Sequence, residues 1–300
     1  MDISVIIVNY NTKKMLSDAI DSIIHHTTDV TYEIIVVDNA SSDGSVDYLL
    51  EKYPQVSTVA LENNLGFGRA NNIGLELATG KYILYLNSDT LLLNNALFAF
   101  YSFMEDAEEL PVGVCGTVML NRELYPTDSN GAFHTITAEC RSFVSLLTSR
   151  FSLPIKLFNV QKRPLPLENK VAVDYVIGAD MFLKRELAEK FRFEENIFMY
   201  AEEMELQYRL VKAGYCNMLI NGPSIIHLEG GSSSTKREES LFKTEQMAKS
   251  LFFMIKKHHS FFYALMFRIV YCVTHFSIFL SSKYSKEFKL KFFRLICSRI

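Results

Sequence analysis

Paired cysteines are missing from this 300-residue chain. Its cysteines are odd in number and widely spaced, at Cys115, Cys140, Cys216, Cys272 and Cys297. Such a set forms neither a disulfide framework nor a paired zinc motif. The pattern is typical of a protein that works in the reducing cytoplasm.

An excess of positive charge is also missing. The chain has 31 Lys and Arg against 34 Asp and Glu, which gives a formal net charge of -3. A protein that follows nucleic acid along its phosphates needs a strong basic field, so we expect no nucleic-acid partner. With 49% hydrophobic and 22% charged residues the composition is that of a globular protein.

A secretory leader is absent at the start of the sequence. The chain opens as MDISVIIVNYN, with an acid at position 2, a short apolar run and no basic residue before it. A signal peptide has a basic start, a longer apolar stretch and a small-residue cleavage site. We therefore expect a strand here and a cytoplasmic protein.

Short apolar runs alternate with helical patterns over the first ninety residues. Strands are predicted at 3–8, 33–37, 56–61 and 81–86, and helices at 15–24, 42–53 and 68–79. Continuous apolar strands that alternate with helices indicate a mostly parallel sheet covered on both faces. The predicted fold class is therefore α/β.

The regular pattern stops at about residue 120 and returns at residue 171. The stretch 120–170, which contains four prolines, is interpreted as a flexible insertion. A strand at 171–177, a helix at 200–213 and a strand at 215–220 follow. We expect a catalytic domain at 1–235, made of a nucleotide-binding half 1–119, the insertion and an acceptor half 171–235, and then a helical tail at 236–300.

Polar residues follow each of the first four predicted strands. They are Asn9-Tyr10-Asn11, Asp38 to Gly44, Glu62-Asn63-Asn64 and Asn87-Ser88-Asp89. Turns favour these residue types by themselves, but ligands of such sheets bind beyond the carboxyl ends of the strands. A carboxylate such as Asp89 suits a hard divalent cation that also holds a diphosphate, although the same residue could cap the next helix.

Six segments carry a specific resemblance. They are SVIIVNYNT, EIIVVDNASSDGS, NLGFGRANNIGLELATGKYILYLNSDT, VIGADMFLKRE, FMYAEEMELQYRLVKAGY and IIHLEGGSS. In this order and spacing, from residue 4 to about 234, the chain resembles the family 2 glycosyltransferases, most closely their rhamnosyltransferase-like branch. The resemblance implies a GT-A fold, with a Rossmann-like sheet, and an inverting transfer of a sugar from a nucleotide diphosphate to an acceptor hydroxyl.

The resemblance also implies where the donor binds. The donor is expected to be a dTDP- or UDP-sugar, carrying rhamnose or another hexose. The residues expected to bind it are Asn9, Asp38, Asn39, Arg69, Asn87, Ser88 and Asp180. Arg69 could equally be a solvated surface residue.

The expected metal site combines Asp89 with His227. Asp89 stands at the end of the family's DXD motif, whose first Asp is Asn87 here. Imidazole is an acceptable ligand for Mn²⁺, and the resemblance implies Mn²⁺ or Mg²⁺ as cofactor. An isolated histidine before a glycine-rich loop is otherwise more often structural.

Three carboxylates, Glu202, Glu203 and Glu205, open the predicted helix at 200–213. Acids in a first turn commonly serve only the helix dipole. The run also resembles the family's ED motif, whose second acid removes the acceptor proton, so Glu203 is the expected catalytic base and Glu202 the fallback. The alternative is a catalytically inactive nucleotide-binding scaffold of a polysaccharide assembly complex.

The tail after residue 250 is rich in phenylalanine, lysine and arginine. Its apolar runs are too short to span a bilayer, and Arg268 interrupts the most apolar stretch. One interpretation is amphipathic helices on the anionic inner face of the cell membrane. The others are packing on the catalytic domain or a homodimer interface. Membrane attachment would favour a glycan or lipid-linked glycan as acceptor.

Overall fold

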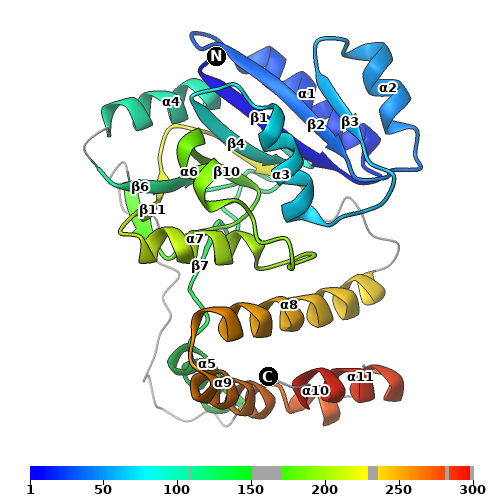
Figure 1. The fold of residues 1–300 in the computed structure, drawn as a ribbon, viewed down its shortest axis with the longest axis vertical. Helices are drawn as coiled ribbons and strands as arrows, with labels where there is room; N and C mark the ends of the chain where they lie inside the picture. Colours follow the sequence, from blue (N-terminus) through cyan, green and yellow to red (C-terminus); the bar gives the residue numbers. More distant parts are fainter. Residues whose placement is uncertain (108–109, 151–169, 229–235, 281–283, 298–300) are drawn as a thin grey trace. The chain divides into compact units, whose positions relative to one another are not determined.

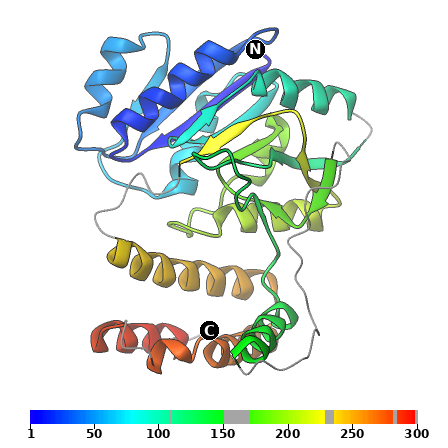
Figure 2. The ribbon, with the colours of Figure 1, turned by 180° about the vertical axis from the view of Figure 1, so that it is seen from behind.

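A computed structural model describes residues 1–107, 110–150, 170–228, 236–280 and 284–297. The chain divides into two compact units (Figures 1 and 2). The first comprises Met1–Ala132 with Leu165–Ser234, and the second comprises Phe133–Pro164 with Thr235–Ile300. The segment expected to be an insertion therefore divides between the two units, and the expected boundary at residue 235 stays a prediction.

An eight-stranded sheet forms the centre of the first unit. Its strands, in spatial order, are β3 (Ser57–Ala60), β2 (Tyr32–Asp38), β1 (Ile3–Asn9), β4 (Tyr82–Asn87), β10 (Asp180–Lys184), β6 (Val112–Thr117), β11 (Cys216–Ile220) and β8 (Lys170–Val173). The pairs β3–β2, β2–β1, β1–β4 and β6–β11 are parallel, whereas β10 is antiparallel to both neighbours and β8 is antiparallel to β11. The predicted mostly parallel α/β sheet is confirmed.

Two expectations about strands differ from the structure. The single strand expected at 171–177 is two short strands, β8 and β9 (Tyr175–Val176), which pair with different partners. Strand β10 was not expected at all, although it lies between β4 and β6. Its sequence DMFLK has only three apolar residues between two charged ones, and its place in the sheet depends on long-range pairing.

Helices cover both faces of the sheet (Figure 1). They are α1 (Lys13–His26), α2 (Ser45–Lys52), α3 (Phe67–Leu77), α4 (Ala96–Asp106), α6 (Arg185–Phe191) and α7 (Glu202–Lys212). Successive side chains of β1 point to opposite faces of the sheet. Val5 packs in one buried core with residues of α1 and α4. Ile6 packs in a second core with residues of α3, α6 and α7. Burial on both sides explains why the strand is mostly apolar, with Ser4 and Asn9 as its polar residues.

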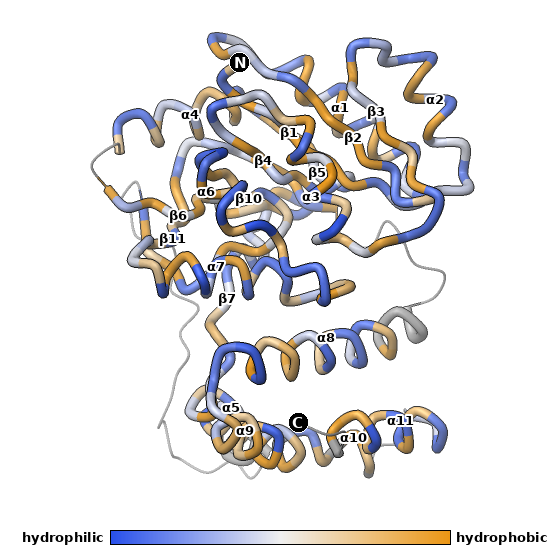
Figure 3. Tube along the Cα trace, viewed as in Figure 1, coloured by the Kyte–Doolittle hydropathy of each residue, from blue (hydrophilic) through white to orange (hydrophobic). Residues whose placement is uncertain are grey.

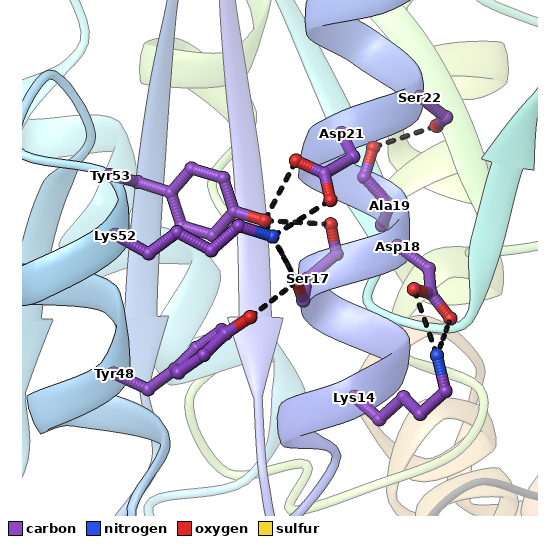
Figure 4. A network of polar contacts seen from close by, with 9 residues as sticks. All are labelled: Lys14, Ser17, Asp18, Ala19, Asp21, Ser22, Tyr48, Lys52 and Tyr53. Carbon is purple, nitrogen blue, oxygen red and sulfur yellow. Dashed lines mark hydrogen bonds and ion pairs between the residues drawn. The ribbon is translucent and has the colours of Figure 1, made fainter.

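A polar network joins α1 to α2 (Figure 4). The hydroxyl of Tyr53, just after α2, donates to Asp21 on α1 at 2.9 Å, and Lys52 makes an ion pair with the same carboxylate at 2.9 Å. Ser17 shares a 2.8 Å hydrogen bond with Tyr53, whose ring is buried. The network holds the C-terminal end of α2 against α1.

The second unit is helical in the part that the structure describes. Its helices are α5 (Ile136–Arg150), α8 (Lys236–His258), α9 (Phe261–Thr274), α10 (Ser277–Leu280) and α11 (Lys286–Cys297). Phe252 of α8 packs edge-on against Phe267 and Tyr271 of α9. Among the described residues, no helix is both long enough and apolar enough to cross a membrane.

Candidate active site

A cleft of about 320 Å³ opens in the first unit, beyond the carboxyl ends of β1, β2 and β4. Residues in the last positions of these strands or just after them line it: Val8, Tyr10 and Thr12 at β1, Asn39 at β2, and Asn87, Ser88 and Asp89 at β4. The other lining residues are Asn64, Phe67, Ile177, Gly178, Ala179, Met199, Tyr200, Glu202, Glu203 and His227. The cleft therefore lies at the edge where the polar turns led us to expect a ligand.

A two-stranded sheet brings His227 to the turn after β4. Strand β12 (Ile225–His227) pairs antiparallel with β5 (Thr90–Leu92), and His227 lies opposite Thr90. The Nε2 atom of His227 is 3.3 Å from Oδ1 of Asp89 and 3.5 Å from Nδ2 of Asn87. The backbone N–H of Leu228 also donates to the Asp89 carbonyl at 2.9 Å, which fixes the two segments together.

This corner of the cleft fits a divalent cation. Asp89 supplies carboxylate oxygens and His227 an imidazole nitrogen, and both side chains are about 15% exposed. No cluster of three or more His, Cys, Asp or Glu side chains suited to a metal occurs in the described part of the chain. Mg²⁺ and similar hard cations commonly take one or two protein ligands and complete their shell with phosphate oxygens and water. Two protein donors therefore suffice here.

The carboxylates of Glu202 and Glu203 enter the cleft from the first turn of α7. The helix is preceded by Tyr200 and Ala201, whose φ angles are 67° and 68°. Residues with side chains seldom adopt this left-handed conformation, and such strain is concentrated at functional sites. The sharp turn places the beginning of α7 at the cleft wall.

The two carboxylates have different surroundings. Glu202 is 4% exposed, and its Oε2 atom has no hydrogen-bond partner among the described residues. Burial, and secondarily the nearby charge of Glu203, raise the pKa of Glu202 well above its usual value. Glu203 is only half-buried. Because two adjacent carboxyl groups resist ionising together, the pair takes up a proton first at the buried Glu202.

Seven of the expected site residues line the same cleft. They are Asn39, Asn87, Ser88, Asp89, Glu202, Glu203 and His227. Asn39 also holds the wall in place, because its side chain accepts from the N–H of Leu65 at 2.8 Å and donates to Asn64 at 2.9 Å. The roles expected for these seven residues in binding and catalysis stay predictions.

Two expected nucleotide ligands, Asn9 and Asp38, lie beneath the lining. Both are buried, and Nδ2 of Asn9 donates to Oδ2 of Asp38 at 2.7 Å. Oδ1 of Asn9 accepts from the Thr12 hydroxyl at 2.6 Å, and Oδ1 of Asp38 accepts from the Ser41 N–H at 2.8 Å. These bonds lock the turns after β1 and β2. A direct contact of either side chain with a nucleotide stays a prediction.

Arg69 and Asp180 also lie outside the cleft lining. The guanidinium of Arg69 donates through Nε to the carbonyl of Glu195 at 2.6 Å. Asp180 is fully buried, and its Oδ2 atom accepts from the Thr117 N–H at 2.7 Å, while Oδ1 has no partner among the described residues. Burial raises the pKa of Asp180 well above its usual value. Their expected contacts with the donor stay predictions.

Aromatic lining residues were missed by the sequence reasoning. Tyr10, Phe67 and Tyr200 line the cleft, and Tyr10 is 39% exposed. Phe67 is held by a bond from its N–H to the carbonyl of Phe198 at 3.1 Å, an approach that only Gly66 allows. The signal was present in the sequence, since each of these aromatics adjoins a polar or glycine-rich turn.

Comparisons with known proteins identify the family of this chain. The family model described as glycosyl transferase family 2 matches residues 4–160, which is more than half of the chain. The chain belongs to this family. The poly(ribitol-phosphate) beta-glucosyltransferase of Bacillus spizizenii is 31% identical to this chain over 198 residues, which cover 61% of this chain. That match spans only 30% of the relative's length.

Solved structures show the same fold. The S. aureus TarS 1–349 fragment in complex with UDP matches with a TM-score of 0.57 at 15% identity, over 98% of this chain and 79% of that one. GalNAc-T7 with UDP, GalNAc and Mn²⁺ matches with a TM-score of 0.64 at 14% identity, over 98% of this chain and 54% of that one. The expected GT-A fold of this family 2 member is confirmed.

Proposed function

We propose that this protein transfers a sugar from a nucleotide-sugar to an acceptor hydroxyl. The observation that carries the proposal is that a candidate metal site and a candidate base meet in one cleft. Asp89 follows β4 and His227 ends β12, and Glu203 lies at the start of α7. Family membership and the two ligands held by the solved relatives, UDP and Mn²⁺, support it.

Glu203 is proposed as the catalytic base. A sugar hydroxyl is a weak nucleophile, and a positioned carboxylate that takes its proton in the transition state contributes about 10²- to 10⁴-fold to the rate. The buried Glu202 supports this role because burial raises its pKa well above the usual value, so Glu202 is the acid of the pair that binds a proton more readily. Direct attack of the acceptor oxygen on the anomeric carbon would invert its configuration.

The diphosphate end of the donor is proposed to lie near Asp89 and His227. When bound there, Mn²⁺ or Mg²⁺ would neutralise the charge of the departing diphosphate. The described lining contains three acids, Asp89, Glu202 and Glu203, and no lysine or arginine. An acidic lining repels a diphosphate, so we expect nucleotide binding by this chain to require a divalent cation.

The sugar and the acceptor are proposed more broadly. The resemblance to the rhamnosyltransferase-like branch favours rhamnose as the sugar, whereas the poly(ribitol-phosphate) beta-glucosyltransferase that matches 61% of the chain favours glucose. The acceptor is proposed to be a hydroxyl of a cell-surface polysaccharide or of a lipid-linked glycan precursor. Both donors belong in one experimental panel.

Calorimetric titration with UDP and with dTDP tests the cation requirement. We expect binding in the presence of Mn²⁺, at least tenfold weaker binding after chelation with EDTA, and the same loss in Asp89→Asn with Mn²⁺ present. Equal affinity with and without metal would overturn the proposed cation site.

Nucleotide diphosphate release from a panel of UDP- and dTDP-sugars, with a membrane-extracted acceptor, tests the transfer. Glu203→Gln should lower kcat by about 10²- to 10⁴-fold without changing the affinity for the nucleotide. Glu189→Gln, which alters an exposed ion pair on α6, is the matched control and should leave both unchanged. Tight nucleotide binding with no turnover on any donor would instead favour the inactive scaffold.

A further inference from the structure

The outward face of α9 is apolar along its whole length. From Phe261 to Phe276 every exposed residue is hydrophobic, with exposed fractions between 37% and 76%. The residues are Phe261, Phe262, Leu265, Met266, Ile269, Val273 and Phe276. Their spacing of three or four residues puts most of them on one side of the helix, and Figure 3 shows the hydrophobic colour of α9. A helix face turned to water is normally polar.

The charge in α9 is turned away from this face. Arg268 is only 9% exposed, because its guanidinium donates to the carbonyl of Ile296 at 3.3 Å and lies 4.8 Å from the ring centre of Phe252. From the sequence, Arg268 was expected to interrupt the apolar stretch. In the structure its side chain points into the helical unit, so the exposed face of α9 is continuously apolar.

Exposed basic residues occur on α8 and α11, which come before and after α9 in the second unit. Residues 251–300 contain nine Lys and Arg and a single acid, Glu287, in a chain whose formal net charge is -3. Lys256 and Lys257 are exposed in the last turn of α8, directly before α9. On α11, Lys286, Lys291 and Arg294 are exposed together with the hydrophobic Leu290 and Phe293. Such residues bring positive charge to the edge of an apolar surface.

We propose that this helical unit binds the surface of an anionic lipid bilayer. The apolar face of α9 would lie at the boundary between the lipid headgroups and the acyl chains. The exposed basic residues would contact lipid phosphates. A helix of 14 residues is too short to cross the hydrocarbon core, so it lies parallel to the membrane plane.

A second copy of the chain is a poorer occupant of this face. A twofold interface would bring together two segments that each carry eight excess positive charges, and the apolar stripe offers no acids to compensate them. An anionic bilayer supplies both the apolar layer and the negative charge. The proposal is independent of the transfer chemistry, because it uses none of the residues of the cleft.

Vesicle co-sedimentation of the full chain tests the proposal. We expect the protein to bind vesicles of phosphatidylcholine with 30% phosphatidylglycerol. Binding should be at least tenfold weaker to vesicles of pure phosphatidylcholine, and also at least tenfold weaker to the anionic vesicles in high salt. The variant Leu265→Glu with Ile269→Glu should lose binding by at least tenfold. The matched control is Leu50→Glu with Leu77→Glu, which alters two exposed leucines of the first unit and should bind like the wild type.

Neutralising the basic edge provides a second test. Lys286→Gln and Arg294→Gln should each weaken binding to the anionic vesicles by about fivefold, the effect of one basic residue near a charged surface. Metal-dependent UDP binding serves as the folding check for every variant. Equal binding by the two double variants would overturn the proposal. So would a wild-type protein that ignores vesicles and forms a dimer that Leu265→Glu with Ile269→Glu dissociates.

Discussion

Two neighbouring acids of α7 illustrate how environment separates identical side chains. Glu202 is buried with an unpartnered carboxyl oxygen, whereas Glu203 is half-buried at the same cleft. The left-handed turn at Tyr200 and Ala201 imposes this difference, because it fixes the direction in which the helix begins. The fold thus places an acid with a raised pKa beside a candidate base, a pairing that costs stability when both carboxyl groups ionise.

Glu202→Gln should stabilise the protein at neutral and alkaline pH. The folded pKa of Glu202 is raised above the reference value of 4.5. Its stabilising contribution is therefore complete below that pH and is lost as pH rises through the folded pKa. Glutamine has nearly the same shape and no charge to bury. Urea unfolding of both proteins from pH 5 to pH 9 measures their free energies of unfolding. The free energy of the variant should exceed that of the wild type by an amount that grows with pH. A difference that stays constant with pH would contradict the prediction.

The turn between β3 and α3 shows how one glycine positions a wall of the cleft. Gly66 has a φ of +88°, and a Cβ atom at this position would clash with the carbonyl oxygen of Phe198. The close approach allows the Phe67 N–H to bond that carbonyl, and it thereby places the Phe67 ring in the lining. Backbone spacing at this turn, more than any side-chain contact, determines the shape of that wall.

Gly66→Ala should therefore weaken nucleotide binding, by about tenfold, the equivalent of about 1.4 kcal/mol. Gly214→Ala is the matched control, since Gly214 also has a positive φ, +94°, but no atom lies near its would-be Cβ. The control should cost only backbone strain, roughly 1 kcal/mol of unfolding free energy, and leave UDP affinity unchanged. Denaturant unfolding together with UDP titration measures both quantities, and equal effects of the two variants would exclude the steric explanation.

Charge is unevenly distributed over the whole molecule. The last fifty residues hold nine basic residues and one acid, and the rest of the chain carries the compensating excess of acid. A sequence pI of about 6.2 conceals this separation. Interaction with a charged surface follows the local potential more than the net charge, so this protein should behave as a basic one toward anionic surfaces.

Retention on a cation exchanger at pH 7.5, above the pI, is the expected outcome. The double variant Lys286→Gln with Arg294→Gln, which neutralises two exposed charges of α11, should elute at a lower salt concentration. The double variant Lys14→Gln with Lys190→Gln, which neutralises two lysines of the first unit, should elute at the same salt concentration as the wild type. Flow-through of the wild-type protein would show that the basic segment is not available to a surface.

The sequence by itself determined the elements that depend on local pattern. The apolar runs of β1, β2 and β4 and the periodicities of α1, α3 and α7 were predicted to within a few residues, because burial on both faces or on one face imposes its own spacing. The same logic located Asp89 and Glu203 at the ends of elements that meet at one cleft. Short-range chemistry is sufficient for these features.

Tertiary structure alone decided the features that join distant segments. Strand β10 enters the middle of the sheet, His227 comes within 3.5 Å of Asn87 across 140 positions, and Arg268 turns inward to leave α9 apolar outside. Each of these features depends on which surfaces the rest of the fold leaves available to the segment. Periodicity within one segment carries no information about its partner, so the pairing of strands and the direction of a single charged side chain follow from the packing of the whole fold.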